Sequence, residues 1–354
     1  MKGFFKTLLA SFIGVFVAML FGVIVLVSIA GSIGSSSKST PEIPESAILK
    51  LDSSLNLSEQ TTEGDFDPSA LLSGGDMAPS STIGILTAIQ AIEKAAEDPA
   101  IKFIYINPTN MAMENSHMEE FRTALVKFKE SGKAIISYCE TYSQGGYYLA
   151  SVADKIYVNP LGGNMMFGLS SSLMFFKGAL DKLGVEIQLI RHGKYKSAGE
   201  QFVNTDISEA NREQNQAMVS SLWNTIASGI CKSRGIDIKE FNRIVNNLSA
   251  TEAEDMVKAG LADGTMTRIE MLDELMGLFG VEKEDDIKMI TLNKYAQAVI
   301  KPNVKASDKI AIIYANGEIT QGNGEGISSD KYAKIISDVR KDSTVKAVLL
   351  RVNS

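Results

Sequence analysis

The stretch Asp98-Pro-Ala-Ile-Lys-Phe-Ile-Tyr-Ile-Asn-Pro108 indicates the fold of this chain. Within it, residues 101–106 form an apolar run of strand length, and Asn107-Pro108 ends that run with two turn-forming residues. Just before it, residues 83–97 carry isoleucine and alanine at helical spacing. The pattern predicts a helix that leads through a short turn into a buried strand.

The same alternation continues toward the C-terminus. The sequence predicts a helix at Met118–Glu130, a strand at Ala134–Cys139, a helix beginning near Gly145 and a strand at Lys155–Val158. A further strand is expected earlier, at Ala47–Leu51. Strands separated by helices of this length predict an α/β fold with a mostly parallel sheet covered on both faces.

Near the end of the chain, part of this pattern recurs. Asp342-Ser-Thr-Val-Lys346 leads into a predicted strand at residues 347–352, as Asp98-Pro-Ala-Ile-Lys102 leads into residues 103–106, an offset of 342 − 98 = 244. A helix is predicted at residues 330–341 before it. The match is short and inexact, but the order of elements agrees, so we interpret it as an internal duplication. Because the chain stops after the second predicted strand, we expect the second copy to be truncated. The alternative is a short C-terminal extension that pairs with the first domain.

The N-terminus carries a long apolar segment. Between Lys6 and Lys38 there is no charged residue, and Leu8–Ala30 is apolar apart from small or hydroxyl residues. As a helix this segment would be roughly 34 Å long, enough to cross a membrane, whereas the apolar part of a cleaved signal peptide is shorter. Ser28-Ile29-Ala30 resembles a cleavage site, so a cleaved signal peptide is the alternative. The positive-inside rule places Lys2 and Lys6 in the cytoplasm and the rest of the chain outside it.

Composition narrows the possible functions. The chain has 354 residues, a net charge of −7 and 45% hydrophobic residues, so nucleic acid is not an expected partner. Cys139 and Cys231 form no metal-binding spacing or disulfide framework, although one bridge between them stays open. Neither a nucleotide-binding nor a zinc motif is present, and no cofactor or metal is expected.

Three groups of residues could carry chemistry. Lys194 and Lys196 flank Tyr195, and a neutral lysine can act as a general base, although two solvated surface lysines are the simpler interpretation. Ser143-Gln-Gly-Gly-Tyr-Tyr148 follows a predicted strand, and its glycines could bring backbone N–H groups to an oxyanion or form only a turn. His117 and His192 lack the sequence context of a catalytic triad.

Two motifs resemble a known family. Tyr142-Ser-Gln-Gly-Gly-Tyr-Tyr-Leu-Ala-Ser-Val-Ala-Asp-Lys-Ile156 and Gly193-Lys-Tyr-Lys-Ser-Ala-Gly-Glu200 resemble segments of the long, duplicated signal peptide peptidases of the protease IV type, peptidase family S49. The final Arg351-Val-Asn-Ser354 is similar to the start of the family's Arg-Val-Asn-Ser-Pro-Gly-Gly segment. The resemblance implies a fold like that of the ClpP/crotonase group and a serine peptidase with a Ser/Lys dyad. It implies that Lys196, and not Lys194, is the general base.

The resemblance also implies that the nucleophile is missing from this chain. In the family, the serine precedes Gly-Gly-Tyr in the second half, and the corresponding first-half position is occupied here by Gln144. The repeat offset places the serine near roughly residue 388, beyond Ser354. We therefore expect this polypeptide alone to be inactive.

The expected organisation is a cytoplasmic flank and membrane anchor at 1–30, a flexible tether at 31–46, a first peptidase-like repeat at 47–300, a linker at 301–308 and a truncated second repeat at 309–354. The family implies cleaved signal peptides and other short apolar peptides as substrates, contact with membrane lipid, and assembly into a homo-oligomer at the cytoplasmic (inner) membrane. The competing interpretations are a non-catalytic membrane-tethered scaffold and a crotonase-like acyl-CoA enzyme. Export argues against the latter, because acyl-CoA is a cytoplasmic substrate.

Overall fold

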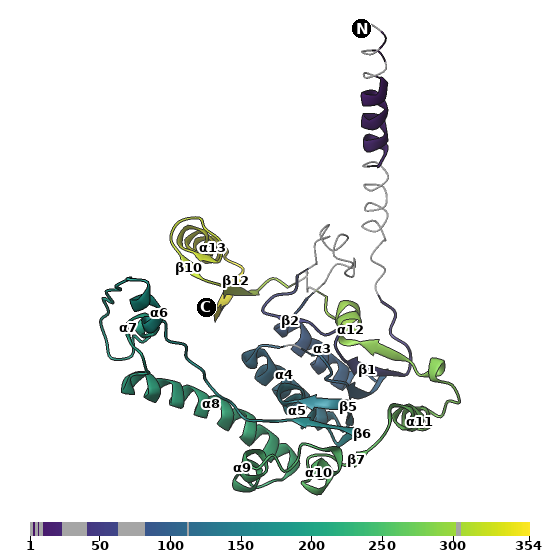
Figure 1. Cartoon of the computed structure of the whole chain (residues 1–354). Coiled ribbons are helices and arrows are strands. Elements are labelled where there is room, and N and C mark those ends of the chain that lie inside the picture. The colour runs from purple at the N-terminus through teal and green to yellow at the C-terminus, as the bar shows by residue number, and fades with distance from the viewer. Residues whose placement is uncertain are drawn as a thin grey trace. The chain divides into compact units, whose positions relative to one another are not determined.

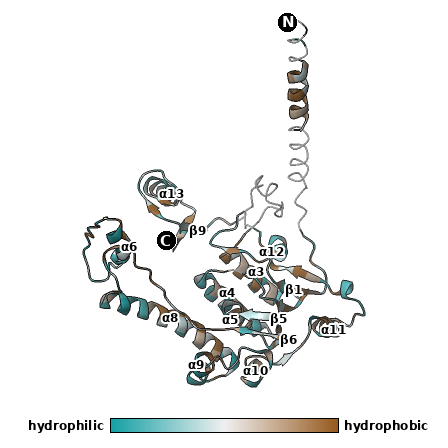
Figure 2. Ribbon diagram, in the orientation of Figure 1, coloured by the Kyte–Doolittle hydropathy of each residue, from teal (hydrophilic) through white to brown (hydrophobic). Residues whose placement is uncertain are grey.

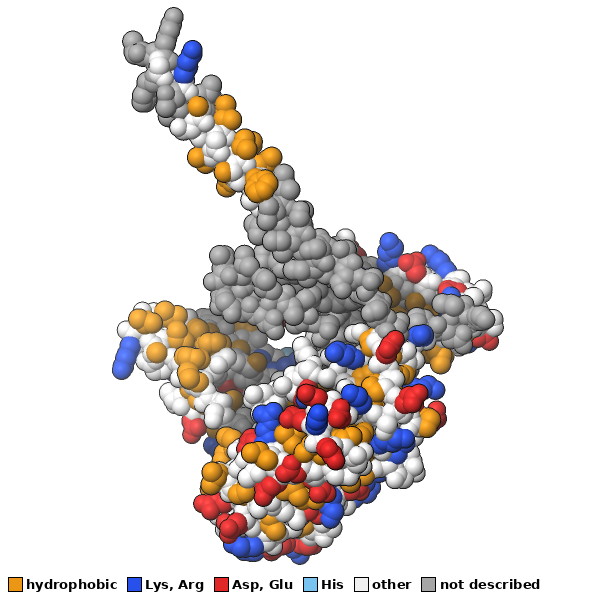
Figure 3. Space-filling model, turned by 90° about the vertical axis from the view of Figure 1, so that its right-hand side faces the viewer, with side chains coloured by type: hydrophobic (Ala, Val, Ile, Leu, Met, Phe, Trp, Pro, Cys, Tyr) orange, Lys and Arg blue, Asp and Glu red, His pale blue; other side chains and the backbone are white. Residues whose placement is uncertain are grey.

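The computed structural model describes residues 3, 6, 10–22, 41–62, 82–111, 113–301 and 306–354. These residues belong to two compact units, Met1–Pro41 and Glu42–Ser354. In the first unit, residues 10–22 are helical, and Figures 2 and 3 show this helix as predominantly hydrophobic. No helix within the described residues is long and apolar enough to cross a membrane, and residues 8, 9 and 23–30 of the expected span Leu8–Ala30 lie outside them.

The second unit is an α/β structure built on a six-stranded sheet (Figure 1). All its strands are parallel, in the order β7-β6-β5-β4-β1-β8. The prediction of an α/β fold with a parallel sheet is therefore confirmed. The sheet strands are β1 (Ala47–Leu51), β4 (Ile101–Ile106), β5 (Ile135–Ser143), β6 (Lys155–Met165), β7 (Gly264–Thr265) and β8 (Met289–Thr291).

Helices cover both faces of this sheet. On one face a large core contains Phe121, Tyr147 and Tyr295, and on the other a smaller core joins Phe103 and Tyr138 to a single helix, α11. The helices packed on the larger core are α3 (Ile85–Glu97), α4 (Asn115–Phe128), α5 (Gln144–Ala150), α8 (Glu209–Arg234), α9 (Ile238–Asn246), α10 (Ala253–Lys258) and α12 (Leu292–Val299), and α11 is Arg268–Phe279.

One segment projects from this core. We call residues 167–208 the arm; it contains α6 (Lys177–Lys182) and α7 (Glu200–Val203) and lies at the far end of the long helix α8 (Figure 1). Its large apolar side chains are mostly exposed, for example Met174 at 68% and Ile190 at 94%. A segment this apolar and this exposed offers surface that nothing in the described part of the chain covers.

Two short β–α–β segments of the chain have the same architecture. The first (residues 47–106) contains β1, β2 (Leu57–Ser58), β3 (Ile83–Gly84), α3 and β4. The second (residues 309–353) contains β9 (Lys309–Asn316), β10 (Ile319–Thr320), β11 (Ile327–Ser328), α13 (Ser329–Lys341) and β12 (Val345–Asn353). In both, the long strands pair in parallel, the two short strands pair in parallel, and the helix has 13 residues.

The agreement between the two segments extends to single hydrogen bonds. In the pairs β1–β4 and β9–β12, the second strand has one extra, unpaired residue directly after its first paired residue. This extra residue is Lys102 in β4 and Lys346 in β12. Each of these lysines donates to a backbone carbonyl three residues earlier, at 2.9 Å and 3.0 Å respectively. The turn before each strand is closed by an aspartate, Asp98 or Asp342, that accepts from the backbone N–H two residues later at 2.9 Å.

The two cysteines form no disulfide in this fold. Cys139 is in β5 and Cys231 is in α8, and both are buried free thiols. Burial raises the pKa of both thiols, so both stay protonated at neutral pH.

Candidate active site

Lys196 lies in the arm, in the turn that precedes α7. Its side chain is exposed and lines a shallow hollow of about 350 Å³ together with Leu189, Arg191, Tyr195 and Gln214. Gly193 begins this turn at φ +111°, a backbone conformation that residues with a Cβ rarely adopt. Within the described part of the chain, the Lys196 amine has no hydrogen bond or ion pair, so it is available to a group brought to it.

The neighbouring Lys194 is in a different electrostatic position. Its ammonium lies 3.0 Å from Oε2 of Glu213 and 3.3 Å from the hydroxyl of Tyr195, which itself donates to Oε1 of Glu213 at 3.1 Å. The hydrogen bonds to Glu213 and Tyr195 raise the pKa of Lys194. A lysine whose charged form is stabilised in this way is poorly suited to act as a base.

Arg191 links the backbone of Lys196 to the buried carboxylate of Glu200. Arg191 donates through Nη1 to the carbonyl oxygen of Lys196 at 2.9 Å and to Oε1 of Glu200 at 2.7 Å. The Glu200 side chain is only 1% exposed and also accepts hydrogen bonds from Ser208 Oγ at 2.8 Å and Asn211 Nδ2 at 3.1 Å. The arm thus presents the Lys196 amine from a turn anchored at its backbone.

The electrostatics of Glu200 follow from these partners. Burial by itself raises the pKa of a carboxyl group, but the hydrogen bonds from Arg191, Ser208 and Asn211 outweigh it and lower the pKa of Glu200 to about 2. Glu200 therefore stays ionised at neutral pH. Sequence reasoning quoted Glu200 within its motif but gave neither it nor Arg191 a role. Glu200 lies four residues after Lys196, and this spacing could have indicated a supporting carboxylate. Nothing in the sequence indicated that Arg191, nine residues before Glu200, would be its partner.

The Ser143–Tyr148 turn has a structural use. Ser143 caps α5, its Oγ accepting the N–H of Gly146 at 3.1 Å. The next side chain, Gln144, accepts the N–H of Gly168 through Oε1 at 3.0 Å. Gly168 is the second residue of the arm and has φ +81°. Gln144, which occupies the first-repeat position that corresponds to the expected serine, thus fastens the root of the arm to the start of α5.

The structure does not bring the other candidate residues together with Lys196. His117 is buried and contacts Glu59, and His192 is exposed in the arm; neither is hydrogen-bonded to a serine of the described chain. The described residues contain no cluster of histidine, cysteine and acidic side chains that could hold a metal ion.

Comparison with known proteins gives consistent results. The model of peptidase family S49 matches residues 127–282, a range that includes both motifs and Lys196. The chain is 31% identical to Protease 4 of Haemophilus influenzae over 94% of its own length and 56% of that protein, and 32% identical to Protease 4 of Salmonella typhi over 75% and 44%. It is 29% identical to the chloroplastic serine protease SPPA of Arabidopsis thaliana over 74% and 40%. The chain spans about half the length of the curated relatives it matches.

Proposed function

Because this chain belongs to peptidase family S49 and is of the protease IV type, we propose that it is the front portion of a serine endopeptidase that uses a Ser/Lys dyad. Lys196 is the general base, and the serine is supplied by a second repeat that continues beyond residue 354. The observation that carries this assignment is the contrast between the two motif lysines. The ammonium of Lys194 is held by Glu213, while the amine of Lys196 is unpaired within the described residues and its backbone is anchored.

The chemistry follows from a neutral Lys196 amine. As the serine oxygen attacks the peptide carbonyl carbon, Lys196 accepts the hydroxyl proton, and it returns that proton to the amine that leaves when the C–N bond breaks. Water then attacks the acyl ester with Lys196 again as the base, and the serine is regenerated. Because removal from water favours the neutral form of an amine, we propose that docking of the second repeat shields Lys196 from solvent.

The two matching β–α–β segments support a duplicated architecture. We propose that residues 47–300 form a first repeat, that 301–308 link the repeats and that 309–354 begin the second. In this scheme Gln144 is the non-nucleophilic counterpart of the serine, since its side chain fastens the arm. The parallel sheet with helices on both faces suits the ClpP/crotonase-like fold that we propose for each repeat.

We further propose an anchored location and apolar substrates. An N-terminal anchor at residues 1–30 and a tether at 31–46 would hold the enzyme at the outer surface of the cytoplasmic membrane, within reach of cleaved signal peptides and other short apolar peptides. The exposed apolar side chains of the arm, among them Leu173, Met174 and Ile190, support an apolar ligand or contact with further copies in a homo-oligomer.

The test compares Lys196→Ala with Lys194→Ala in the full-length protein, using a short apolar peptide as substrate. Removing a general base is expected to lower kcat by about 10²–10⁴-fold. Lys194→Ala is the matched control and should keep activity close to that of the wild type. Equal activity in the Lys196 variant would contradict the dyad, and a wild-type protein without peptidase activity would favour the non-catalytic scaffold.

A further inference from the structure

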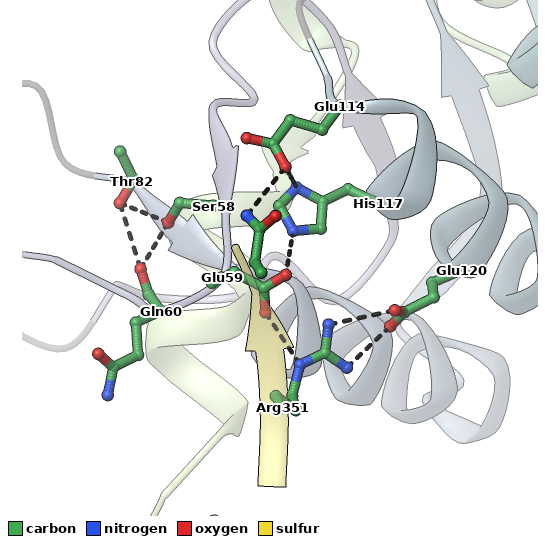
Figure 4. A network of polar contacts seen from close by, with 9 residues as sticks. Ser58, Glu59, Gln60, Thr82, Glu114, His117, Glu120 and Arg351 are labelled. Carbon is green, nitrogen blue, oxygen red and sulfur yellow. Dashed lines mark hydrogen bonds and ion pairs between the residues drawn. The ribbon is translucent and has the colours of Figure 1, made fainter. Parts of the chain in front are cut away.

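A charge cluster remote from Lys196 joins the second β–α–β segment to the rest of the unit (Figure 4). Arg351 of β12 donates from Nε to Oε2 of Glu59 at 2.9 Å and from its two terminal nitrogens to the carboxylate of Glu120 at 3.2 Å and 3.1 Å. Glu59 and Glu120 precede Arg351 in the sequence by 292 and 231 positions, respectively. The contact therefore fixes one part of the fold against another and is not local.

The geometry of this contact is that of a strong ion pair. The two terminal nitrogens of the guanidinium make parallel hydrogen bonds to one carboxylate, and Nε makes a hydrogen bond to a second carboxylate. All three nitrogens of the planar group therefore have a charged partner. The side chains of Arg351 and Glu59 are 21% and 9% exposed, so water screens the pair less than an ordinary surface pair. Burial raises the pKa of Glu59, but the hydrogen bonds from Arg351 and His117 outweigh it and the pKa is lowered.

Two further contacts support the same side of the cluster. Nε2 of His117, which is 2% exposed, lies 2.9 Å from Oε1 of Glu59 and holds that carboxylate in place. Asn353 donates to Oε2 of Glu114 at 3.2 Å. Residues 351 and 353 point to the same face of a strand, so the end of β12 meets the first two turns of α4 and its N-cap through two successive side chains.

We propose that Arg351 is a positioning residue that clamps the end of β12 to α4, so that the chain entering the second repeat starts from a fixed place beside the first. We call the contact of Arg351 with Glu59 and Glu120 the clamp. The proposal rests on the proposed function for its catalytic consequence, because the serine is expected on the chain that follows β12. The clamp itself can be measured without any peptidase activity.

The first experiment measures docking in the 354-residue chain. Both native cysteines are buried, so spin labels can be placed on cysteines substituted for two exposed residues at equivalent positions, Gln90 in α3 and Lys334 in α13. With the clamp intact, the distance between the labels should show one narrow distribution. Arg351→Gln should broaden it and so should Glu59→Gln, and combining the two should add little, because each removes the same contact.

A control on the same strand separates the clamp from a general loss of charge. Lys346 lies 3.9 Å from Asp308 in an exposed pair, and Lys346→Gln should leave the distribution narrow. An unchanged distribution in Arg351→Gln would overturn the clamp. If the variant does not fold, Arg351→Lys decides instead: it keeps the charge but loses the bidentate fork, and a width equal to that of the wild type would also overturn the proposal.

The second experiment uses the full-length protein and separates the clamp from the proposed function. Arg351→Gln should lower kcat on the order of 10²-fold with little change in KM, because misplaced catalytic groups affect the chemical step. Arg351→Lys should restore part of the rate. An active wild type with an equally active Arg351→Gln would overturn the positioning role. An inactive wild type would instead count against the peptidase assignment and leave the spin-label result standing.

Discussion

The first and second β–α–β segments have the same local structure but very different surroundings. β1 and β4 lie inside a six-stranded sheet and are almost completely buried. Within the described residues β9 and β12 pair only with each other; most apolar side chains of β12 are exposed, and β9 is only partly buried. Strand pairing, the extra lysine and the closing aspartate are nevertheless the same in both. Local sequence is therefore sufficient for the pairing, while burial depends on what the remainder of the chain contributes.

The largest effect should come from truncating equivalent core positions. Ile104 in β4 is fully buried, and its counterpart Val348 in β12 (348 − 104 = 244) is 54% exposed. Ile104→Ala should lower the free energy of unfolding by about 2–5 kcal/mol. Val348→Ala should change it by less than about 0.5 kcal/mol in this chain. Urea unfolding of both variants makes the measurement, and similar losses would mean that the burial contrast is wrong.

The same pair of variants sharpens the comparison in the full-length protein. If a second repeat completes the sheet around β12, Val348 becomes buried and its truncation should cost about 1–3 kcal/mol, the loss expected for buried apolar atoms. A cost that stays below about 0.5 kcal/mol in the longer protein would count against a completed second sheet.

An intermediate effect is expected in the arm, which has no counterpart in the described part of the second segment. Glu200→Gln leaves Arg191 without its charged partner and should destabilise the arm by about 1.5–3 kcal/mol. Amide hydrogen exchange of residues 190–205 provides the measurement. Glu213→Gln is the control, since Glu213 is an exposed carboxylate that pairs with Lys194 on the surface. Equal exchange in the two variants would contradict the role assigned to Glu200.

Low pH should destabilise the arm through the same carboxylate, Glu200. The pKa of Glu200 is lowered in the folded protein from 4.5 to about 2, so its contribution to stability is present above pH 4.5 and is lost as the pH falls toward 2. In Glu200→Gln this part of the pH dependence should disappear. Exchange of residues 190–205 between pH 5 and pH 2 tests this, and an identical pH profile in wild type and variant would refute it.

The smallest expected difference concerns the two closing aspartates. Asp98 and Asp342 each accept hydrogen bonds from a backbone N–H and from a hydroxyl, but the hydroxyl of Tyr295 on Asp98 (3.0 Å) is partly buried, whereas that of Thr344 on Asp342 (2.6 Å) is exposed. Because losing a partly buried hydrogen bond costs more than losing an exposed one, Asp98→Ala should cost about 0.5–1.5 kcal/mol more than Asp342→Ala. Thermal unfolding of both variants tests this, and Tyr295→Phe should remove most of the difference. A larger loss for Asp342→Ala would reverse the expected order.

Periodicity was sufficient to predict much of the fold. The first strand was predicted at Ala47–Leu51 and occupies those residues, and the helix predicted at Met118–Glu130 lies at Asn115–Phe128. Boundaries shifted because α4 begins after Glu114 without a side-chain cap that a pattern could detect. Apolar periodicity could not tell whether an apolar side chain has a partner, so Val348 and Leu349 belong to a predicted strand but are exposed.

The candidate site was less accessible to sequence reasoning. A motif resemblance pointed to Lys196, and that assignment stays a prediction. The clamp and the support of Lys196 by Arg191 and Glu200 depend on side chains from separate turns or elements that meet only in the folded chain. No spacing rule relates Arg351 to Glu59, because 292 residues lie between them.

The clamp also makes the contact between the two segments asymmetric. The shift from β1 to β9 (309 − 47 = 262) places Gln321 at the position of Glu59, and the shift of 244 from β4 to β12 places Asn107 at the position of Arg351. The reciprocal contact would therefore join two neutral amides. Two identical copies related by a twofold axis would make every contact twice, but this one can form only once. If the segments arose by duplication, the substitutions at these positions removed the symmetry and left one order in which the halves can meet.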